Sequence, residues 1–288
     1  MADDVMRTAA AEAQAAPKGA TLPAPPESRA DKARRLVYRS RFAVFYFLLA
    51  VVAGVAIGAL VVLVGRGTPA PAPAWSAWEP IGSSGRRAAL IGEHVSGAYT
   101  LPSGDALTAV TYAGPPIVTG PDGAAFQVRA LAVRPDASRG RAEADAVDTI
   151  NAASTVMFTL CGLGEACSIS EGEPTLERGA LLRRQALELA LYSFTYIDDI
   201  GSIVVLLPPR ADGQAATALF LERSDLRAEL GVPLDQTFTA PATPGVGEIP
   251  AEELRVIQRV TRSRIYDYNY LQAQDGSPVM VLTPALVS

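Results

Sequence analysis

The longest apolar segment of the chain runs from Phe42 to Val64, and none of its 23 residues carries a charge. As a helix it would be about 34 Å long, more than the hydrocarbon core of a bilayer at about 30 Å. A buried core helix is the alternative, but helices of globular domains rarely stay apolar on every face for this length. The pattern therefore predicts a transmembrane helix over residues 42–64, surrounded by the lipid bilayer.

Basic side chains are concentrated on the N-terminal side of this apolar segment. Those that precede it are Lys32, Arg34, Arg35, Arg39 and Arg41, and Arg66 follows it. Because basic flanks are retained on the cytoplasmic side, we expect a cytoplasmic N-terminus and an extracytoplasmic C-terminal domain. The predicted location is the cell membrane, crossed once.

A cleaved secretory signal is the competing interpretation of the same segment. Ala72 and Ala74 form an A-x-A cleavage pattern before Trp75. Against cleavage, the apolar stretch exceeds the 7 to 15 residues that are usual in signal peptides, and the region before it is too long. The sequence therefore favours an uncleaved anchor.

Three small residues, Ala50, Gly54 and Gly58, are spaced by four within the apolar segment and share one helix face. Small residues at this spacing allow two helix backbones to approach closely, which would give a homodimer through the transmembrane helix. The alternative is that this face contacts only lipid.

The segments that flank the predicted span differ from it in composition. Residues 1–30 are rich in Ala, Pro and small polar residues and predict a disordered cytoplasmic tail. Residues 31–41 form a basic juxtamembrane segment suited to anionic lipid heads. Residues 65–80 are rich in Pro and Ala and predict an extended linker.

Residues 81–288 alternate between patterns typical of helices and of strands, and we expect them to form one extracytoplasmic domain. The predicted strands are 106–112, 125–134, 155–161, 202–209, 217–223, 264–274 and 278–284, and the predicted helices are 84–100, 174–196, 224–230 and 250–260. At least two antiparallel hairpins appear, without a strict βαβ alternation. The expected class is α+β, with a mixed or antiparallel sheet and one long covering helix.

The charge of the chain is divided unevenly. The formal net charge is −5, yet the first 41 residues hold 8 Lys and Arg against 5 acids, whereas the remainder holds 17 Arg, no Lys and 25 acids. An acidic domain repels the phosphates of nucleic acid. Nucleic acid is therefore excluded as an expected partner.

The two cysteines, Cys161 and Cys167, are separated by the glycine-containing loop GLGEA. In an oxidising compartment this pair predicts a local disulfide rather than two buried thiols. A redox pair would have C-x-x-C spacing, and a structural zinc would need two further ligands. We therefore expect no metal site.

Candidates for catalysis are few. His94 is the only histidine, and no G-x-S-x-G turn accompanies it, so it is a weak candidate for a general base and more simply a surface or capping residue. The adjacent acids at 198–199 and 252–253 are typical of helix ends. No Walker loop, dinucleotide fingerprint or zincin motif is present, so we expect no catalytic or cofactor-binding residues and no cofactor.

The long helix carries one charge on its apolar side. In helical projection this face comprises Leu176, Ala180, Ala186, Leu187, Ala190 and Phe194, with Glu177, Arg184, Gln185 and Glu188 opposite. Arg183 projects into the middle of the apolar face. An unpaired buried charge costs several kcal/mol, so Arg183 predicts an internal ion pair, a side chain that reaches the edge, or an anion-binding site.

These patterns favour a non-catalytic, membrane-anchored interaction or assembly module of the cell envelope. Its expected partners are the lipid bilayer, another membrane or envelope protein, and a second copy through the transmembrane helix. The alternative is an extracytoplasmic membrane-anchored hydrolase with an unfamiliar site.

Overall fold

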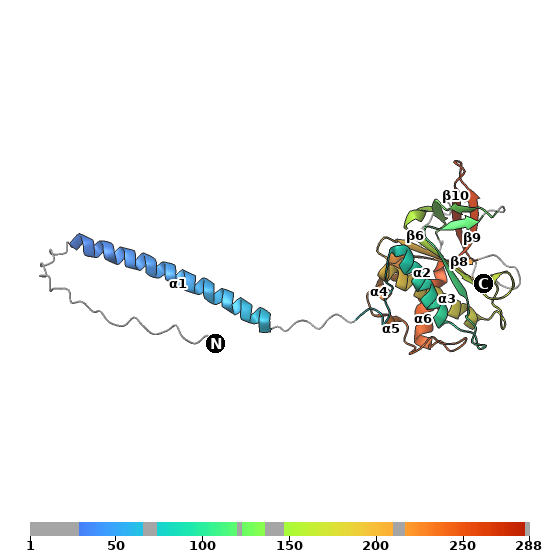
Figure 1. Cartoon of the computed structure of the whole chain (residues 1–288), viewed down its shortest axis with the longest axis horizontal. Helices are drawn as coiled ribbons and strands as arrows, with labels where there is room; N and C mark the ends of the chain where they lie inside the picture. Colours follow the sequence, from blue (N-terminus) through green and yellow to red (C-terminus); the bar gives the residue numbers. More distant parts are fainter. Residues whose placement is uncertain (1–28, 66–73, 120–122, 136–146, 210–216, 286–288) are drawn as a thin grey trace, which may run out of the picture. The chain divides into compact units, whose positions relative to one another are not determined.

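The computed structural model describes residues 29–65, 74–119, 123–135, 147–209 and 217–285 (Figure 1). The chain divides into two units, Met1–Pro71 and Ala72–Ser288. The tail predicted to be disordered lies outside the described residues up to residue 28, and the helix of the first unit begins at Arg29.

The first unit contains one helix, α1 (Arg29–Gly65). Its window Phe42–Val61 has a mean hydropathy of 2.6, and no part of this window is buried. By length and composition α1 can cross a membrane. A side-chain carbon added at Gly54 or Gly58 would meet no atom within 4 Å, so this helix face is open.

The second unit is built on an eight-stranded sheet. In spatial order its strands are β1 (Ala109–Ala113), β6 (Thr155–Cys161), β7 (Ser202–Leu206), β8 (Thr217–Glu222), β9 (Ile265–Gln272), β10 (Pro278–Pro284), β4 (Ala130–Val133) and β5 (Asp148–Asn151). A separate hairpin joins β2 (Ile117–Thr119) to β3 (Ala125–Gln127). The pairs β6–β7 and β10–β4 are parallel and the other pairs are antiparallel, so the predicted α+β class with a mixed sheet is confirmed.

Helices pack on one face of this sheet. They are α2 (Ser84–Ala98), α3 (Leu176–Tyr196), α4 (Arg227–Leu230), α5 (Leu234–Thr237) and α6 (Ala251–Thr261). The crossover between the parallel strands β6 and β7 contains α3, since parallel neighbours need such a connection. Thr175 caps the start of α3, and the guanidinium of Arg223 donates at 2.6 Å to the carbonyl oxygen of Phe194 near its end. This bond holds the end of α3 to the residue that follows β8.

The central strand β7 is buried at all five positions, which explains its uninterrupted apolar sequence. Ile203 and Val205 belong to the core between sheet and helices. Val204 and Leu206 face the other way, into a second apolar cluster. Both faces of β7 are therefore covered.

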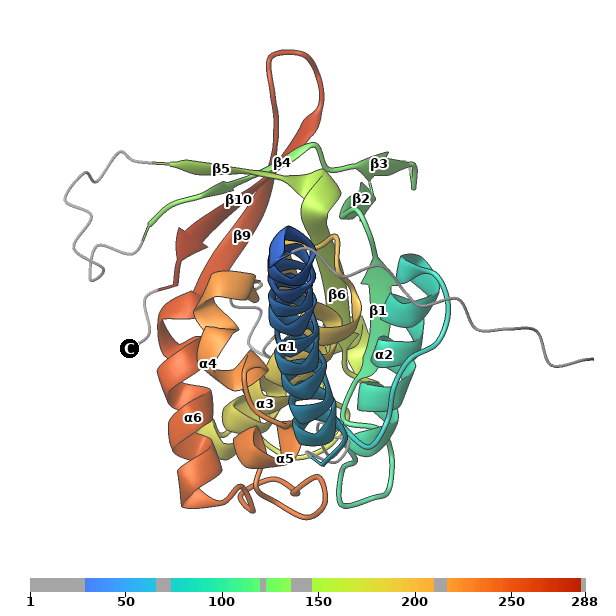
Figure 2. The same cartoon turned by 90° about the vertical axis from the view of Figure 1, so that its left-hand side faces the viewer.

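The second cluster is covered by a distant part of the same sheet. Tyr266 of β9, Met280 and Leu282 of β10, and Leu131 of β4 are buried there against Phe220 of β8. The sheet thus bends over its own face, and in Figure 2 β4 and β5 run across the end of the sheet that contains β6 and β1. The second unit is a half-open barrel with helices on its outer face.

The structure differs from the sequence expectations at several short elements. β2, β5 and α5 were not predicted, because segments of three or four residues carry too little periodicity. The predicted linker over 65–80 also ends too late. Trp75 and Trp78 already pack against the helix-side core, and the carbonyl oxygen of Trp75 accepts from Leu234 at 2.8 Å.

Candidate functional site

The bent sheet leaves a cavity of about 430 Å³ at one mouth of the half-open barrel. Val133 and Pro135 line it from the end of β4, and Asp148 and Ile150 from β5. The opposite wall consists of Phe220 and Glu222 of β8, Arg264, and Tyr266 of β9. β5 and β8 are separated by three strands in the sheet, so the bend alone brings these walls together.

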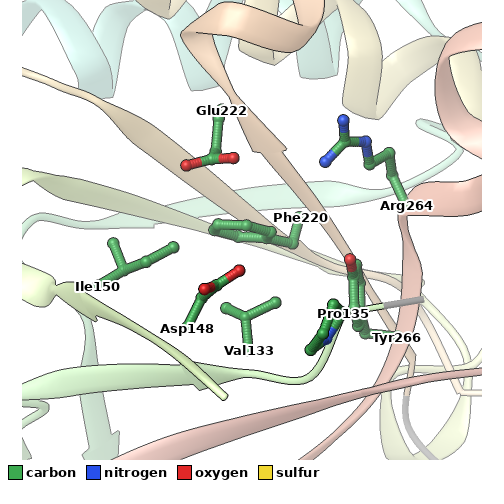
Figure 3. Close-up of a pocket in the computed structure, with 8 residues that line it drawn as sticks. All are labelled: Val133, Pro135, Asp148, Ile150, Phe220, Glu222, Arg264 and Tyr266. Carbon is green, nitrogen blue, oxygen red and sulfur yellow. The ribbon is translucent and has the colours of Figure 1, made fainter. Parts of the chain in front are cut away.

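Charged side chains converge on an apolar floor in this cavity (Figure 3). Phe220 and Tyr266 are 2% and 1% exposed and form the floor. In Figure 3 the carboxylates of Glu222 and Asp148 lie on either side of the Phe220 ring, and the guanidinium of Arg264 lies on the same side of the ring as Glu222. Glu222 is half-buried and Asp148 is exposed, so both are accessible to a ligand.

Asp225 organises the upper wall of the cavity. One of its carboxylate oxygens forms an ion pair with Arg264, and the other accepts from the backbone N–H of Glu222 at 2.9 Å. The side chains of Arg264 and Asp225 are 16% and 10% exposed. A mostly buried ion pair thus fixes both Arg264 and the backbone of Glu222.

A second polar cluster lies inside the helix layer, around Arg184 of α3. Its guanidinium pairs with Glu188 at 3.1 Å and, through Nε, with Glu253 of α6, and it donates to the hydroxyl of Tyr99. Tyr99 donates in turn to Glu188 at 2.6 Å, and the ring of Phe238 lies 4.4 Å from the guanidinium carbon. This buried Arg184 network joins α3 to α6 and to the segment after α2.

The charged side chains of the Arg184 network are almost completely buried. Arg184, Glu188 and Glu253 are 3%, 8% and 1% exposed. Burial raises the pKa of Glu188 above its ordinary value, although Arg184 and the Tyr99 hydroxyl oppose this shift. Burial also raises the pKa of Tyr99, which keeps its hydroxyl proton available to Glu188. The network is satisfied internally and serves packing.

The sequence projection placed the buried charge of α3 at the wrong residue. Arg184, Gln185 and Glu188, expected on the solvent side, are buried, whereas Leu176 is 88% exposed. Arg183 is half-buried, and its Nε donates at 3.2 Å to the carbonyl oxygen of Gly179 in the same helix. The proposed anion site at Arg183 stays a prediction.

His94 lies in a group of aromatic side chains. Its ring stacks on Trp78 with 4.0 Å between centroids and meets the edge of Tyr192. Burial lowers the pKa of His94, so the ring is neutral over a wider pH range. These contacts attach the start of the domain to α2 and α3.

Cys161 and Cys167 have their sulfur atoms at disulfide-bond distance, 2.03 Å, in agreement with the predicted bridge. The intervening loop doubles back closely. A side-chain carbon at Gly162 would fall 2.1 Å from the carbonyl oxygen of Ser168, so only glycine fits at this position.

Sequence reasoning missed the cavity because its walls come from strands that are distant in the chain. The available signal was the presence of charged residues, Asp148, Glu222 and Arg264, at or next to the ends of strands. That signal is common at strand ends and does not reveal which ends meet. Among the described residues, no group of three or more His, Cys, Asp or Glu side chains is arranged to hold a metal ion.

Comparison of the chain with models of protein families, with curated proteins and with solved structures finds no match.

Replacement of Arg184 by Leu should lower the free energy of unfolding by about 3–5 kcal/mol, because it leaves two buried carboxylates without their cation. The neighbouring change Arg183→Leu is the matched control and should cost at most about 1 kcal/mol, since that side chain is only half-buried. Denaturant unfolding of the detergent-solubilised protein measures both. Equal losses for the two variants would contradict the assigned role of Arg184.

Glu188→Gln should change the pH dependence of stability. Because the pKa of Glu188 is raised in the folded protein, the folded protein retains a proton that the unfolded chain has already lost. The free energy of unfolding of the wild type therefore falls as pH rises from the ordinary glutamate pKa through the raised value. The variant lacks this titration. Its stability relative to wild type should therefore improve as pH rises through that window.

Unfolding measured from about pH 4 to pH 8 tests this, with Glu252→Gln, an exposed acid on α6, as the control. A wild-type-to-variant difference that stays constant with pH would show that Glu188 has no raised pKa.

Proposed function

We propose that this chain is a single-pass membrane protein of the cell envelope whose outer domain is a binding module in an assembly of envelope components. The N-terminus is cytoplasmic, and the unit Ala72–Ser288 is extracytoplasmic. Its partners are the bilayer and another membrane or envelope protein, with a second copy of the chain as a further partner through Ala50, Gly54 and Gly58.

The observation that carries the anchoring proposal is the exposed apolar surface of α1. Its large side chains between Phe42 and Val61 are 47% to 70% exposed, with none of the window buried. Apolar surface in water costs about 25 cal/mol per Å². A bilayer removes this cost along the whole helix, because an apolar length of this size matches the hydrocarbon core.

The orientation in the proposal is supported by the charge asymmetry of the chain. Basic residues lie before the apolar window, between Lys32 and Arg41, whereas the domain that follows is acidic. Basic segments stay on the cytoplasmic side and attract anionic lipid heads. The acidic domain has no such attraction to an anionic surface.

The binding role is supported by the cavity at the mouth of the half-open barrel. It has a volume in the range of small-ligand sites and combines an apolar floor with a few convergent charges. Barrel mouths are frequent ligand sites, because strand ends deliver side chains to one place. The buried Arg184 network and the packed His94 offer no comparable access.

Alkaline carbonate washing and protease treatment of intact cells test the anchoring and the orientation. The full chain should remain in the membrane pellet, and external protease should remove the C-terminal domain while sparing an N-terminal tag. A control that replaces Val52 and Val55 by Arg should release the protein, since charges in the bilayer core are costly. Carbonate extraction of the wild-type chain, or protection of its C-terminal domain, would refute the proposal.

An extracytoplasmic hydrolase is the second candidate. The observation that favours it is the pair of carboxylates, Asp148 and Glu222, which face one cavity from different strands. A hydrolase of this kind should release product from fluorogenic ester, amide or glycoside substrates and should lose that activity in Glu222→Gln. Equal product release by Glu222→Gln and wild type, or none by either, would remove this candidate.

A further inference from the structure

The loop that follows β6 holds two neighbouring residues in an uncommon backbone conformation. Ala166 and Cys167 have φ angles of 50° and 65°, and among the described residues they are the two non-glycine residues with positive φ. Side chains other than that of glycine rarely occupy this left-handed region, because the β-carbon then lies too close to a backbone carbonyl oxygen. The loop is therefore strained at two adjacent positions.

The same loop is folded back tightly on its own backbone. The N–H of Gly162 donates to the carbonyl oxygen of Cys167 at 2.9 Å, and the N–H of Gly164 donates to the carbonyl oxygen of Ser168 at 2.8 Å. Two separate thiols occupy more room than one bond between two sulfur atoms. The compact shape of the loop therefore depends on the bridge between Cys161 and Cys167.

The bridged loop lies at the surface of the domain. Leu163 is 52% exposed, Glu165 and Ala166 are exposed, and both cysteines are half-buried. A reductant can therefore approach the bridge while the sheet stays folded. Strained and accessible disulfides are the ones that are reduced most readily.

From the strained backbone, the compact shape and the surface position of this loop we infer that the Cys161–Cys167 bridge is a redox-sensitive switch. A dithiol reductant opens the bridge, and the loop over residues 162–168 then unfolds locally while the sheet and α3 stay folded. The inference concerns the second unit alone and does not rest on the anchoring or on the cavity.

The chemical step is thiol–disulfide exchange. A thiolate of the reductant attacks one sulfur atom of the bridge, which breaks the bond between Cys161 and Cys167, forms a mixed disulfide and releases the other cysteine as a thiolate. The second thiolate of the reductant then displaces the remaining cysteine. Two electrons pass to the bridge, the dithiol is oxidised to a disulfide, and the two cysteines take up the protons that the dithiol has lost.

The surroundings of the loop confine the change. On one side, Phe158 and Leu160 of β6 are buried in the core and do not depend on the bridge. On the other side, residues 170–177 are exposed, and α3 has its own cap at Thr175. Opening of the loop is thus separated from α3 by an exposed segment.

Hydrogen exchange of the detergent-solubilised full chain, before and after an excess of reduced dithiothreitol, tests the local opening. We expect two alkylatable thiols per chain, and exchange of the amides of residues 162–168 that is faster by about tenfold or more. The amides of β7 and of the buried part of α3 should keep their protection. The double variant Cys161→Ser and Cys167→Ser should match the reduced wild type.

The contribution of the strained backbone is tested by Ala166→Gly, because glycine adopts positive φ without a steric cost. In buffers of reduced and oxidised glutathione, the bridge of this variant should be harder to reduce than that of the wild type by at least about threefold in the equilibrium constant. The control is Ala125→Gly, an exposed position of β3 without positive φ, which should leave the constant unchanged.

Three results would overturn the inference. The first is a bridge that dithiothreitol reduces only after the domain is unfolded. The second is a loss of protection in β7 together with the loop, which would make the bridge a structural support of the whole domain. The third is an equal equilibrium constant for Ala166→Gly, Ala125→Gly and the wild type.

Discussion

The second unit depends on one guanidinium held away from water. Arg184 lies between α3 and α6 with Glu188, Glu253 and Tyr99 around it, and each of these groups is buried. A buried ion pair adds little net stability, because desolvation offsets the attraction, but a separated one is strongly unfavourable. The network therefore specifies which helices pack together. Misplacing α6 or the segment after α2 would leave an uncompensated charge in the core.

The helix layer leaves the second apolar face of the sheet to be covered by another part of the chain. β7 and β8 are apolar on both sides, and the helices cover only one of them. The remaining face is covered by the continuation of the sheet, from β9 to β4, which bends back over it. This bend brings together the ends of β8 and β5, which are separated by three strands in the sheet, and the cavity lies between them. The cavity is thus a product of how the sheet buries its second face.

Much of the architecture followed from the sequence, because strong periodicity and long apolar runs carry it. The apolar run of α1, the positions of α2 and α3, and the buried strand β7 are of this kind. The projection put Arg183 in the middle of the buried face, whereas Arg184 is the buried arginine, and this difference has a physical reason. A projection assumes one apolar face, whereas α3 is covered by the sheet, α2 and α6, so that even Arg184 and Glu188 are buried. The cavity was not predictable, since local patterns do not encode the bend.

The Arg184 network and the cavity differ in how accessible their charged side chains are. In the Arg184 network the guanidinium already has carboxylate and hydroxyl partners, and an entering ligand would have to displace them inside the core. At the cavity the carboxylates of Asp148 and Glu222 stand at accessible positions beside a rigid aromatic floor. The cavity is therefore the more open of the two charged regions, and the Arg184 network belongs to the packed interior behind it.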